Sequence, residues 1–300
     1  MNVIEVTDLM RSFPCIGGWN DALVGINLQV APGEVVGLLG RNGAGKTTLI
    51  ELLMGLYPAD TGQVRLFGLD PREAPVEVKR RIGYVPDKLL LPESMSFERV
   101  IAFHRELFAT WDEEFANQVI EDFGLKVNQR LGDMSKGQAQ QAALVCAVSH
   151  KPELLLLDEP AAGLDPAARR EFLEVTIRLL HEQETTILFS SHHMNDVERL
   201  AERVVMLDGG QVLLDDSIDR LKEEFSLALV TKDAGVSQEN LMDLEGCIRA
   251  REQNGVLRAV FSRNSEKALD LLQPHLESDS VRCEALPLEE LFVELVGGRS

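Results

Sequence analysis

Gly40-Arg-Asn-Gly-Ala-Gly-Lys46-Thr47 decides the fold of this chain, because it fits the phosphate-binding pattern G-x-x-x-x-G-K-[ST]. The apolar run Val35–Leu39 before it predicts a buried strand, and Lys46–Gly55 after it predicts a helix ended by glycine. Backbone N–H groups of such a loop and the N-terminus of the helix can surround phosphate oxygens, while the lysine reaches the β- and γ-phosphates. The residues predicted to contact a nucleotide here are Gly40, Arg41, Asn42, Gly43, Ala44, Gly45, Lys46, Thr47 and Thr48.

A second motif ends another apolar strand with two carboxylates. Leu154–Leu157 is followed by Asp158 and Glu159, and polar groups at a strand end lie where α/β sheets bind ligands. Alone, the pair would be interpreted as solvated charges that open a loop. Because the chain also holds a P-loop, we predict that Asp158 and the Thr47 hydroxyl hold Mg²⁺. Glu159 is predicted to polarise the water that attacks the γ-phosphate.

Ser135 and Gln138 form the S-x-x-Q pattern of a capping box ahead of the helical run Ala139–Val148. The simplest interpretation is a well-capped helix. The functional interpretation is that the same helix N-terminus faces a phosphate. Gly137 would then permit close approach of the backbone, and the Ser135 hydroxyl would donate to a γ-phosphate oxygen.

Composition excludes several classes of protein. The chain has 300 residues, 45% of them hydrophobic, and a net charge of -19, which disfavours nucleic acid as the main partner. No apolar run is long enough to span a bilayer, and the N-terminus lacks the pattern of a signal peptide. The four cysteines are far apart, which suits a reducing compartment and argues against a zinc site.

Strand-like runs alternate with helical stretches in the first part of the chain, which predicts an α/β core. Between about residues 92 and 150 the strand signal disappears, and we expect an all-helical subdomain with helices at Ser96–Phe108, Asp112–Phe123 and after Ser135. The predicted strands are Val3–Val6, Val35–Leu39, Ile82–Val85, Leu154–Leu157, Thr186–Ser190 and Val204–Leu207.

Residues 225–300 predict a separate, small α+β domain. Their strand and helix signals follow the order β-α-β-β-α-β of ferredoxin-like folds. A closing helix is expected to begin at Pro287 and to end at Gly297, with one apolar face. A docking element without a catalytic part is the alternative interpretation of that helix. The apolar face consists of Leu288, Leu291, Phe292 and Leu295.

Taken in order, the motifs resemble those of the nucleotide-binding subunit of an ATP-binding cassette (ABC) transporter, over residues 1 to about 215. Gly40–Thr47 is similar to the Walker A motif of that family, Leu154–Glu159 to its Walker B motif, and Leu131–Gln138 to its signature motif. Gly163-Leu-Asp165 resembles its D-loop, and Ser190-Ser-His192 resembles its switch region, with His192 as the γ-phosphate sensor. A histidine at a strand end is usually only a surface residue, and the surrounding pattern alone raises His192 above that.

The resemblance implies a P-loop NTPase cassette with a mixed α/β sheet core and a helical insertion that binds ATP and Mg²⁺. Glu159 and His192 would be catalytic. Two cassettes would pair head to tail, so that Ser135 serves the nucleotide of the partner. Dimer closure would move separate transmembrane permease subunits through the cleft around Tyr84–Leu91, which places the chain on the cytoplasmic face of the membrane. The other signature and D-loop residues implied in nucleotide contact are Gly137, Gln138 and Asp165.

Three positions depart from the family pattern or leave a choice. Lys136 stands where the usual signature has its first glycine, as also seen in the drug- and polysaccharide-type exporter branch. Asp87 stands where the family has a glutamine, and its carboxylate could still meet Mg²⁺ or water, which makes it the third candidate metal residue beside Thr47 and Asp158. Phe13 is the candidate for stacking on adenine by its spacing from the first strand, with Trp19 as the rival. Lys136 and Asp87, together with the similarity of the C-terminal region to accessory domains of ABC-2 exporters, favour an exporter over an importer.

Two alternatives stay open at this point. A soluble ABC ATPase that acts on ribosomes or DNA would carry two cassettes or a long coiled coil between its Walker motifs. This chain has one cassette and only a helical insertion. A P-loop GTPase should show Asn-Lys-x-Asp, which does not occur, and a P-loop kinase would not need the signature or His192.

Overall fold

The computed structural model describes residues 1–89, 92–181, 184–231, 236–253, 255–275 and 281–297. The chain divides into two compact units, Met1–Asp215 and Asp216–Ser300, and each has its own sheet and its own apolar core. Residues 298–300, which end the predicted second domain, lie outside the described residues.

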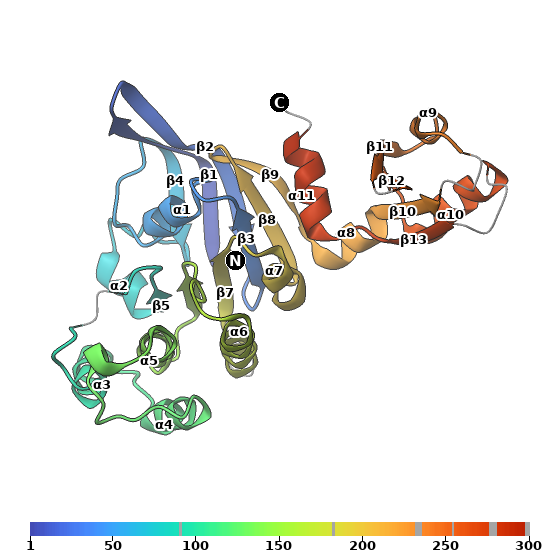
Figure 1. Ribbon diagram of the computed structural model, residues 1–300. Helices are drawn as coiled ribbons and strands as arrows, with labels where there is room; N and C mark the ends of the chain where they lie inside the picture. Colours follow the sequence, from blue (N-terminus) through green and yellow to red (C-terminus); the bar gives the residue numbers. More distant parts are fainter. Residues whose placement is uncertain (90–91, 182–183, 232–235, 254, 276–280, 298–300) are drawn as a thin grey trace. The chain divides into compact units, whose positions relative to one another are not determined.

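A six-stranded sheet forms the centre of the first unit (Figure 1). Its order is β5-β6-β7-β3-β8-β9, and the pairs from β5 to β8 are parallel. β9 follows β8 after only Gly209 and Gly210, a connection so short that the two strands must run antiparallel. The strands are β3 (Val35–Gly40), β5 (Ile82–Val85), β6 (Leu154–Leu157), β7 (Thr186–Ser191), β8 (Arg203–Asp208) and β9 (Gln211–Ser217).

A second, antiparallel sheet in this unit was not predicted. It has the order β2-β1-β4, with β1 at Ile4–Cys15, β2 at Gly18–Val30 and β4 at Thr61–Leu66. The predicted strand Val3–Val6 therefore covers only the start of β1. The polar and exposed first half of β2 hides the strand pattern, and irregular pairing between β1 and β2 interrupts the alternation.

The main core of the first unit lies between these two sheets. Side chains of β1, β2 and β4 meet the helix α1 (Lys46–Leu53) and one face of the six-stranded sheet. Ile4, Leu49 and Leu38 are fully buried representatives of the three layers. Burial of this face fixes α1, and with it the loop that precedes α1, against the end of β3.

Helices occupy the long connection from β5 to β6, as predicted. They are gathered away from the antiparallel sheet (Figure 1). Ser135 caps its helix as predicted, and Asp112 caps α4 in the same way, since each side chain accepts a backbone N–H of the first turn. The helices of this subdomain are α3 (Phe97–Leu107), α4 (Glu113–Asp122), the 3₁₀ turn Leu131–Asp133 and α5 (Lys136–Val148). Elsewhere in the unit lie α2 (Pro75–Arg80), α6 (Pro166–His181) and α7 (Met194–Leu200).

The second unit has an antiparallel sheet of order β11-β12-β10-β13, which confirms the ferredoxin-like order. The closing helix begins at Leu288, one residue after the predicted start, and Leu291 and Phe292 are buried on its apolar face. The side chain of Leu295 lies outside the described residues. The elements are α8 (Ile218–Glu224), β10 (Ser226–Thr231), α9 (Gln238–Met242), β11 (Cys247–Gln253), β12 (Val256–Phe261), α10 (Ser265–Leu272), the 3₁₀ turn Gln273–His275, β13 (Val281–Ala285) and α11 (Leu288–Gly297).

Candidate nucleotide-binding and catalytic site

The predicted phosphate loop connects the end of β3 to the start of α1. Gly45 has a φ of +104°, and a Cβ there would lie 2.5 Å from the carbonyl oxygen of Ala22, so a side chain at this position would be strained. No side chain caps α1, and no acidic residue occupies its first turn. The first N–H groups of the helix are therefore left for an anion.

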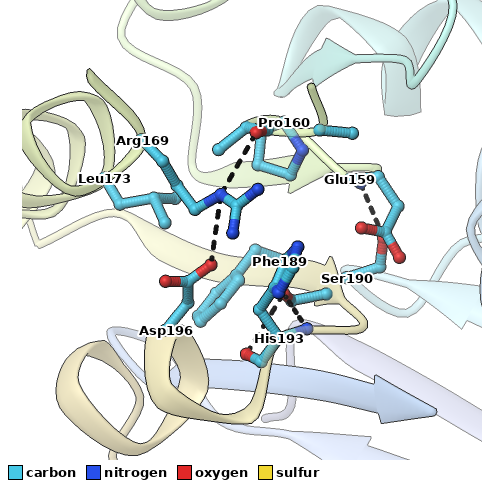
Figure 2. Close-up of a pocket in the computed structure, with 11 residues that line it drawn as sticks. Glu159, Pro160, Arg169, Leu173, Phe189, Ser190, His193 and Asp196 are labelled. Carbon is cyan, nitrogen blue, oxygen red and sulfur yellow. Dashed lines mark hydrogen bonds and ion pairs between the residues drawn. The ribbon is translucent and has the colours of Figure 1, made fainter. Parts of the chain in front are cut away.

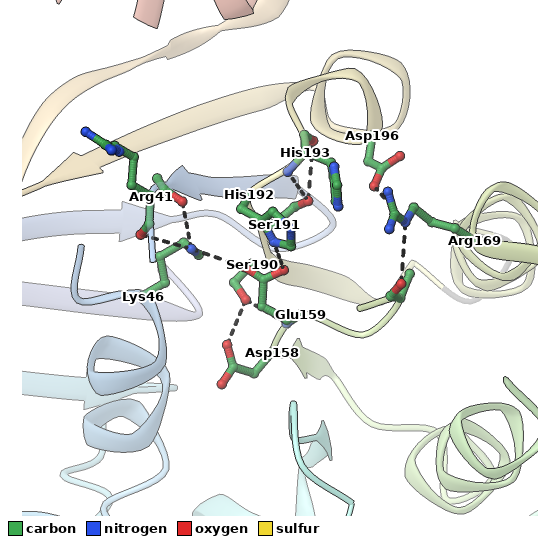
Figure 3. Close-up of polar contacts among 12 residues, drawn as sticks. Arg41, Lys46, Asp158, Glu159, Arg169, Ser190, Ser191, His192, His193 and Asp196 are labelled. Atoms are coloured by element: carbon green, nitrogen blue, oxygen red, sulfur yellow. Dashed lines mark hydrogen bonds and ion pairs between the residues drawn. The ribbon is translucent and has the colours of Figure 1, made fainter. Parts of the chain in front are cut away.

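Lys46 opens α1 and its side chain is only 5% exposed. Its Nζ donates to the carbonyl oxygen of Gly40 at 2.7 Å and lies 3.1 Å from Glu159 Oε1 (Figure 3). A buried ammonium requires such a counter-ion, because an unpaired charge is costly to bury. The contact brings the predicted P-loop lysine and the predicted catalytic glutamate together in one cluster.

Asp158 and Glu159 follow the last residue of β6, where the backbone leaves the sheet. The N–H of Asp158 still donates to the carbonyl oxygen of Val85 on β5 at 2.9 Å. Glu159 has a φ of +46°, an uncommon conformation for a residue with a side chain. Its N–H donates to Ser190 Oγ at 2.7 Å, and Ser190 Oγ donates to Asp158 Oδ1, also at 2.7 Å.

His192 follows β7 and reaches the same glutamate. Its Nδ1 lies 2.7 Å from Glu159 Oε2, and its side chain is 37% exposed (Figure 3). Glu159 therefore has one carboxylate oxygen beside Lys46 and the other beside His192. The ends of β3, β6 and β7 bring three predicted site residues into contact, as expected at the carboxyl edge of a parallel sheet.

Burial dominates the electrostatics around Asp158. It raises the pKa of Asp158, against hydrogen bonds from Ser190 and Thr47 that lower it. Burial, followed by the charge of Asp158, also raises the pKa of Tyr84 to about 12 and raises the pKa of Glu51. A bound cation would relieve this concentration of negative charge.

The oxygen atoms around Asp158 fit Mg²⁺. The carboxylate is 1% exposed, and the hydroxyl of Thr47 is a hydrogen-bond partner of it. Magnesium favours a few such oxygens together with substrate phosphates. Asp87 is half-buried and close enough for its charge to raise the pKa of Asp158. The three predicted metal residues are thus found at one place.

The signature residues form a separate, exposed edge. Ser135 Oγ accepts the N–H of Gln138 at 3.2 Å, and Gln138 Oε1 accepts the N–H of Ser135 at 3.0 Å, which completes the capping box. A methyl group on Gly163 would lie 2.6 Å from Lys136 Nζ, so Lys136 lies against the predicted D-loop. Asp165 is exposed and caps α6 by accepting the N–H of Ala168 at 3.1 Å. Ser135 is likewise exposed.

A small pocket behind Glu159 contains an ion pair that the sequence did not indicate (Figure 2). Arg169 Nε lies 3.9 Å from Asp196 Oδ2 and 3.4 Å from the carbonyl oxygen of Ala161. Burial raises the pKa of Asp196. His193 lines this pocket, and its ring lies against that of His192 with centroids 3.9 Å apart. The only signal in the sequence for the pair is the acidic residue in the first turn of α7.

The two candidates for adenine stacking lie on the hairpin of β1 and β2. Phe13 is half-buried, with the guanidinium of Arg11 4.6 Å from its ring centroid and Tyr57 against its edge. Trp19 is 72% exposed. Both side chains present aromatic surface that adenine could stack on.

Comparisons with known proteins decide the family. Residues 23–162 match the family described as ABC transporter. The chain is 31% identical to the bacitracin transport ATP-binding protein BcrA of Bacillus licheniformis, over 99% of this chain and 98% of the relative. The chain belongs to the ABC transporter family. This ABC chain is also 30% identical to the daunorubicin/doxorubicin resistance ATP-binding protein DrrA of Streptomyces peucetius, over 92% of this chain and 88% of the relative.

Solved structures agree on the cassette fold. An ATP binding subunit of an ABC transporter shares 28% identity and a TM-score of 0.64 with this ABC chain, covering 73% of it and 92% of the subunit. The predicted fold class is confirmed, and the chain is an ATP-binding ABC ATPase. None of the helices in its described part has the length and hydropathy that a membrane span requires.

Proposed function

We propose that this ABC ATPase powers an exporter as one half of a head-to-tail cassette dimer docked on separate transmembrane subunits. The observation that supports its catalytic part is the cluster of Lys46, Glu159 and His192 beside a glycine-lined helix N-terminus. The residues proposed for nucleotide contact, metal binding and catalysis are those predicted from the sequence.

The chemistry follows from what each side chain can do. N–H groups of the phosphate loop and the ammonium of Lys46 would bind and orient the triphosphate. Glu159 would accept the proton of the attacking water, and His192 would contact the γ-phosphate and hold the Glu159 carboxylate. Asp158, Thr47 and Asp87 would hold Mg²⁺, which supplies charge neutralisation of the phosphates when bound.

A second cassette would complete the site. Ser135 and Asp165 are both exposed, so a partner cassette could reach them. The capped N-terminus of α5 carries oriented N–H groups and the added cation of Lys136, which suit the γ-phosphate held by a partner. A single chain would then bind ATP, and efficient hydrolysis would require two.

The permease would dock on an apolar cleft between the core and the helical subdomain. Tyr84 and Pro86 line one side of this cleft, and His104, Phe108 and Ala147 line the other. The cleft adjoins the strand end that leads to Asp87, so a partner seated there would be coupled to the nucleotide. Leu90 and Leu91 of the predicted cleft lie outside the described residues.

Export is proposed from the relatives and from Lys136. The name of one relative refers to bacitracin transport, and the name of another refers to daunorubicin/doxorubicin resistance. Location at the cytoplasmic face of the membrane, through the permease, follows from the same proposal. A soluble ABC ATPase without a transport role is the alternative, and equal ATP turnover with and without co-purified membrane subunits would favour it.

The decisive experiment replaces the proposed base. Glu159→Gln should lower ATP turnover by about 100-fold or more while ATP binding persists, because a carboxamide cannot accept the proton. With ATP, the variant should accumulate as a dimer in size measurements of the full chain with its membrane partner. Glu121→Gln, which changes an exposed carboxylate on α4, is the matched control and should behave as the wild type. A Glu159→Gln protein that hydrolyses ATP normally would refute the assignment.

A further inference from the structure

Ser190 occupies a special position at the end of β7. The last paired residues of β6 and β7 are Leu157 and Phe189. One step further along each strand, Asp158 and Ser190 would be the next pair, but the backbone of β6 turns away at Glu159. The side chain of Ser190 forms hydrogen bonds to Asp158 and Glu159 at the point where the backbone pairing of the two strands ends.

The Ser190 hydroxyl both accepts and donates a hydrogen bond, and its partners are Glu159, the proposed base, and Asp158, the proposed metal ligand. Its oxygen accepts the N–H of Glu159, and its proton is donated to Asp158 Oδ1, each at 2.7 Å (Figure 3). Ser190 is 0% exposed, so water cannot replace these bonds. A hydroxyl has one proton to donate, and the bond to Asp158 uses it.

The two bonds constrain different things. The bond to Asp158 holds the orientation of a carboxylate that is 1% exposed and that has Thr47 as a further hydrogen-bond partner. The bond from Glu159 holds a backbone with a φ of +46°, which a non-glycine residue keeps only when its surroundings enforce it. One side chain therefore aligns the proposed metal ligand and the proposed base with each other.

We propose that Ser190 is a positioning residue that orients Asp158 for Mg²⁺ and Glu159 for water. The inference rests on the proposed function, because it takes the roles of both carboxylates from there. Ser190 does not touch the nucleotide. Its removal should therefore weaken the contribution of Mg²⁺ and leave metal-free ATP binding intact. Removal of a side chain that orients a metal ligand commonly lowers metal affinity or activity by about 10- to 100-fold.

The test measures ATP affinity of the full chain by calorimetry, once with Mg²⁺ and once with a chelator. In Ser190→Ala, the ratio of the ATP affinity with Mg²⁺ to the ATP affinity with chelator should fall by about 10-fold. The affinity with chelator itself should change less than about twofold. Ser190→Cys should show the same loss, because a thiol nearly keeps the volume and donates only weakly. The cysteine variant carries the test if the alanine variant does not fold.

Controls separate this inference from the proposed function. Ser149→Ala removes another fully buried hydroxyl, which donates to the carbonyl oxygen of Val145 at 2.6 Å, and should keep the wild-type ratio. Asp158→Asn should abolish the Mg²⁺ effect, and an unchanged ratio there would overturn the metal role itself. If Asp158→Asn loses the effect and both Ser190 variants keep it within about twofold, Ser190 is not a positioning residue. An equal loss in Ser149→Ala would also overturn the inference.

Discussion

Acidification should destabilise the first unit through one buried histidine, His150. This residue is 2% exposed, and its Nε2 lies 3.1 Å from the carbonyl oxygen of Ile82 on β5. Its ring stacks on Phe108 with centroids 4.0 Å apart. His150 thus joins the helical subdomain to the edge strand of the main sheet, and its environment favours the neutral ring.

The magnitude follows from the pKa of His150, which burial lowers from 6.5 to about 4. Between these values the unfolded chain binds a proton that the folded chain rejects, so the free energy of unfolding falls as the pH falls. The loss is about 1.4 kcal/mol between pH 7.5 and 5.5, and about 3 kcal/mol once the pH is below 4.

Urea unfolding followed by tryptophan fluorescence measures this loss in the right unit, because Trp19 and Trp111 are the two tryptophans of the chain and both lie within Met1–Asp215. His150→Gln removes the titrating group but keeps an N–H that can donate to Ile82. Between pH 7.5 and 5.5 the variant should lose about 1.4 kcal/mol less stability than the wild type. Burial also lowers the pKa of His104, whose charge further lowers the pKa of His150, so the difference between the two proteins includes this coupling.

An exposed histidine provides the control. His275→Gln, in the second unit, should leave the pH dependence of the tryptophan signal unchanged. Equal pH slopes for the wild type and His150→Gln, within about 0.3 kcal/mol, would refute the reasoning, because additive effects are reproducible only to that level.

Three further outcomes test the nucleotide site. Lys46→Ala should weaken ATP binding by about 10-fold or more in calorimetry, since a charge-assisted hydrogen bond contributes about 1.5–3 kcal/mol, and unchanged affinity would contradict the P-loop assignment. Gly45→Ala should lower the free energy of unfolding by about 1–2 kcal/mol in urea, because the side chain meets Ala22 at a positive φ; a wild-type midpoint would disprove the strain. Phe13→Ala should weaken ATP binding several-fold and Trp19→Ala less, as loss of an aromatic stack of about 0.5–1.5 kcal/mol predicts; the reverse order would assign adenine to Trp19.

Strands buried on both faces were predictable from the sequence, whereas the exposed first half of β2 was not. Leu154–Leu157 and Ile82–Val85 have the predicted bounds, because strands covered on both sides are continuously apolar. β2 was missed because its pairing begins at exposed, polar residues around Trp19, where no alternation of burial marks a strand. These residues form a strand because they pair antiparallel with β1, and that pairing cannot be read from the local sequence pattern.

The candidate site shows the same division. Local motifs indicated Lys46, Asp158 and Glu159, because Lys46 ends the glycine-rich loop after β3 and the two carboxylates directly follow β6. The hydrogen bonds of Ser190 to Asp158 and Glu159 could not be predicted, because they depend on which strands are neighbours and on the register of those strands. The pair of Arg169 and Asp196 depends likewise on the packing of α6 beside α7.

The contact between Lys46 and Glu159 has a consequence for the affinity of ATP itself. An ammonium already neutralised by a carboxylate attracts a triphosphate less than a bare one does, so part of the binding free energy is spent on separating the two. A carboxamide at position 159 removes that internal competitor. The Glu159→Gln protein should accordingly bind nucleotide more tightly than the wild type even as an isolated monomer, before dimerisation or hydrolysis plays any part.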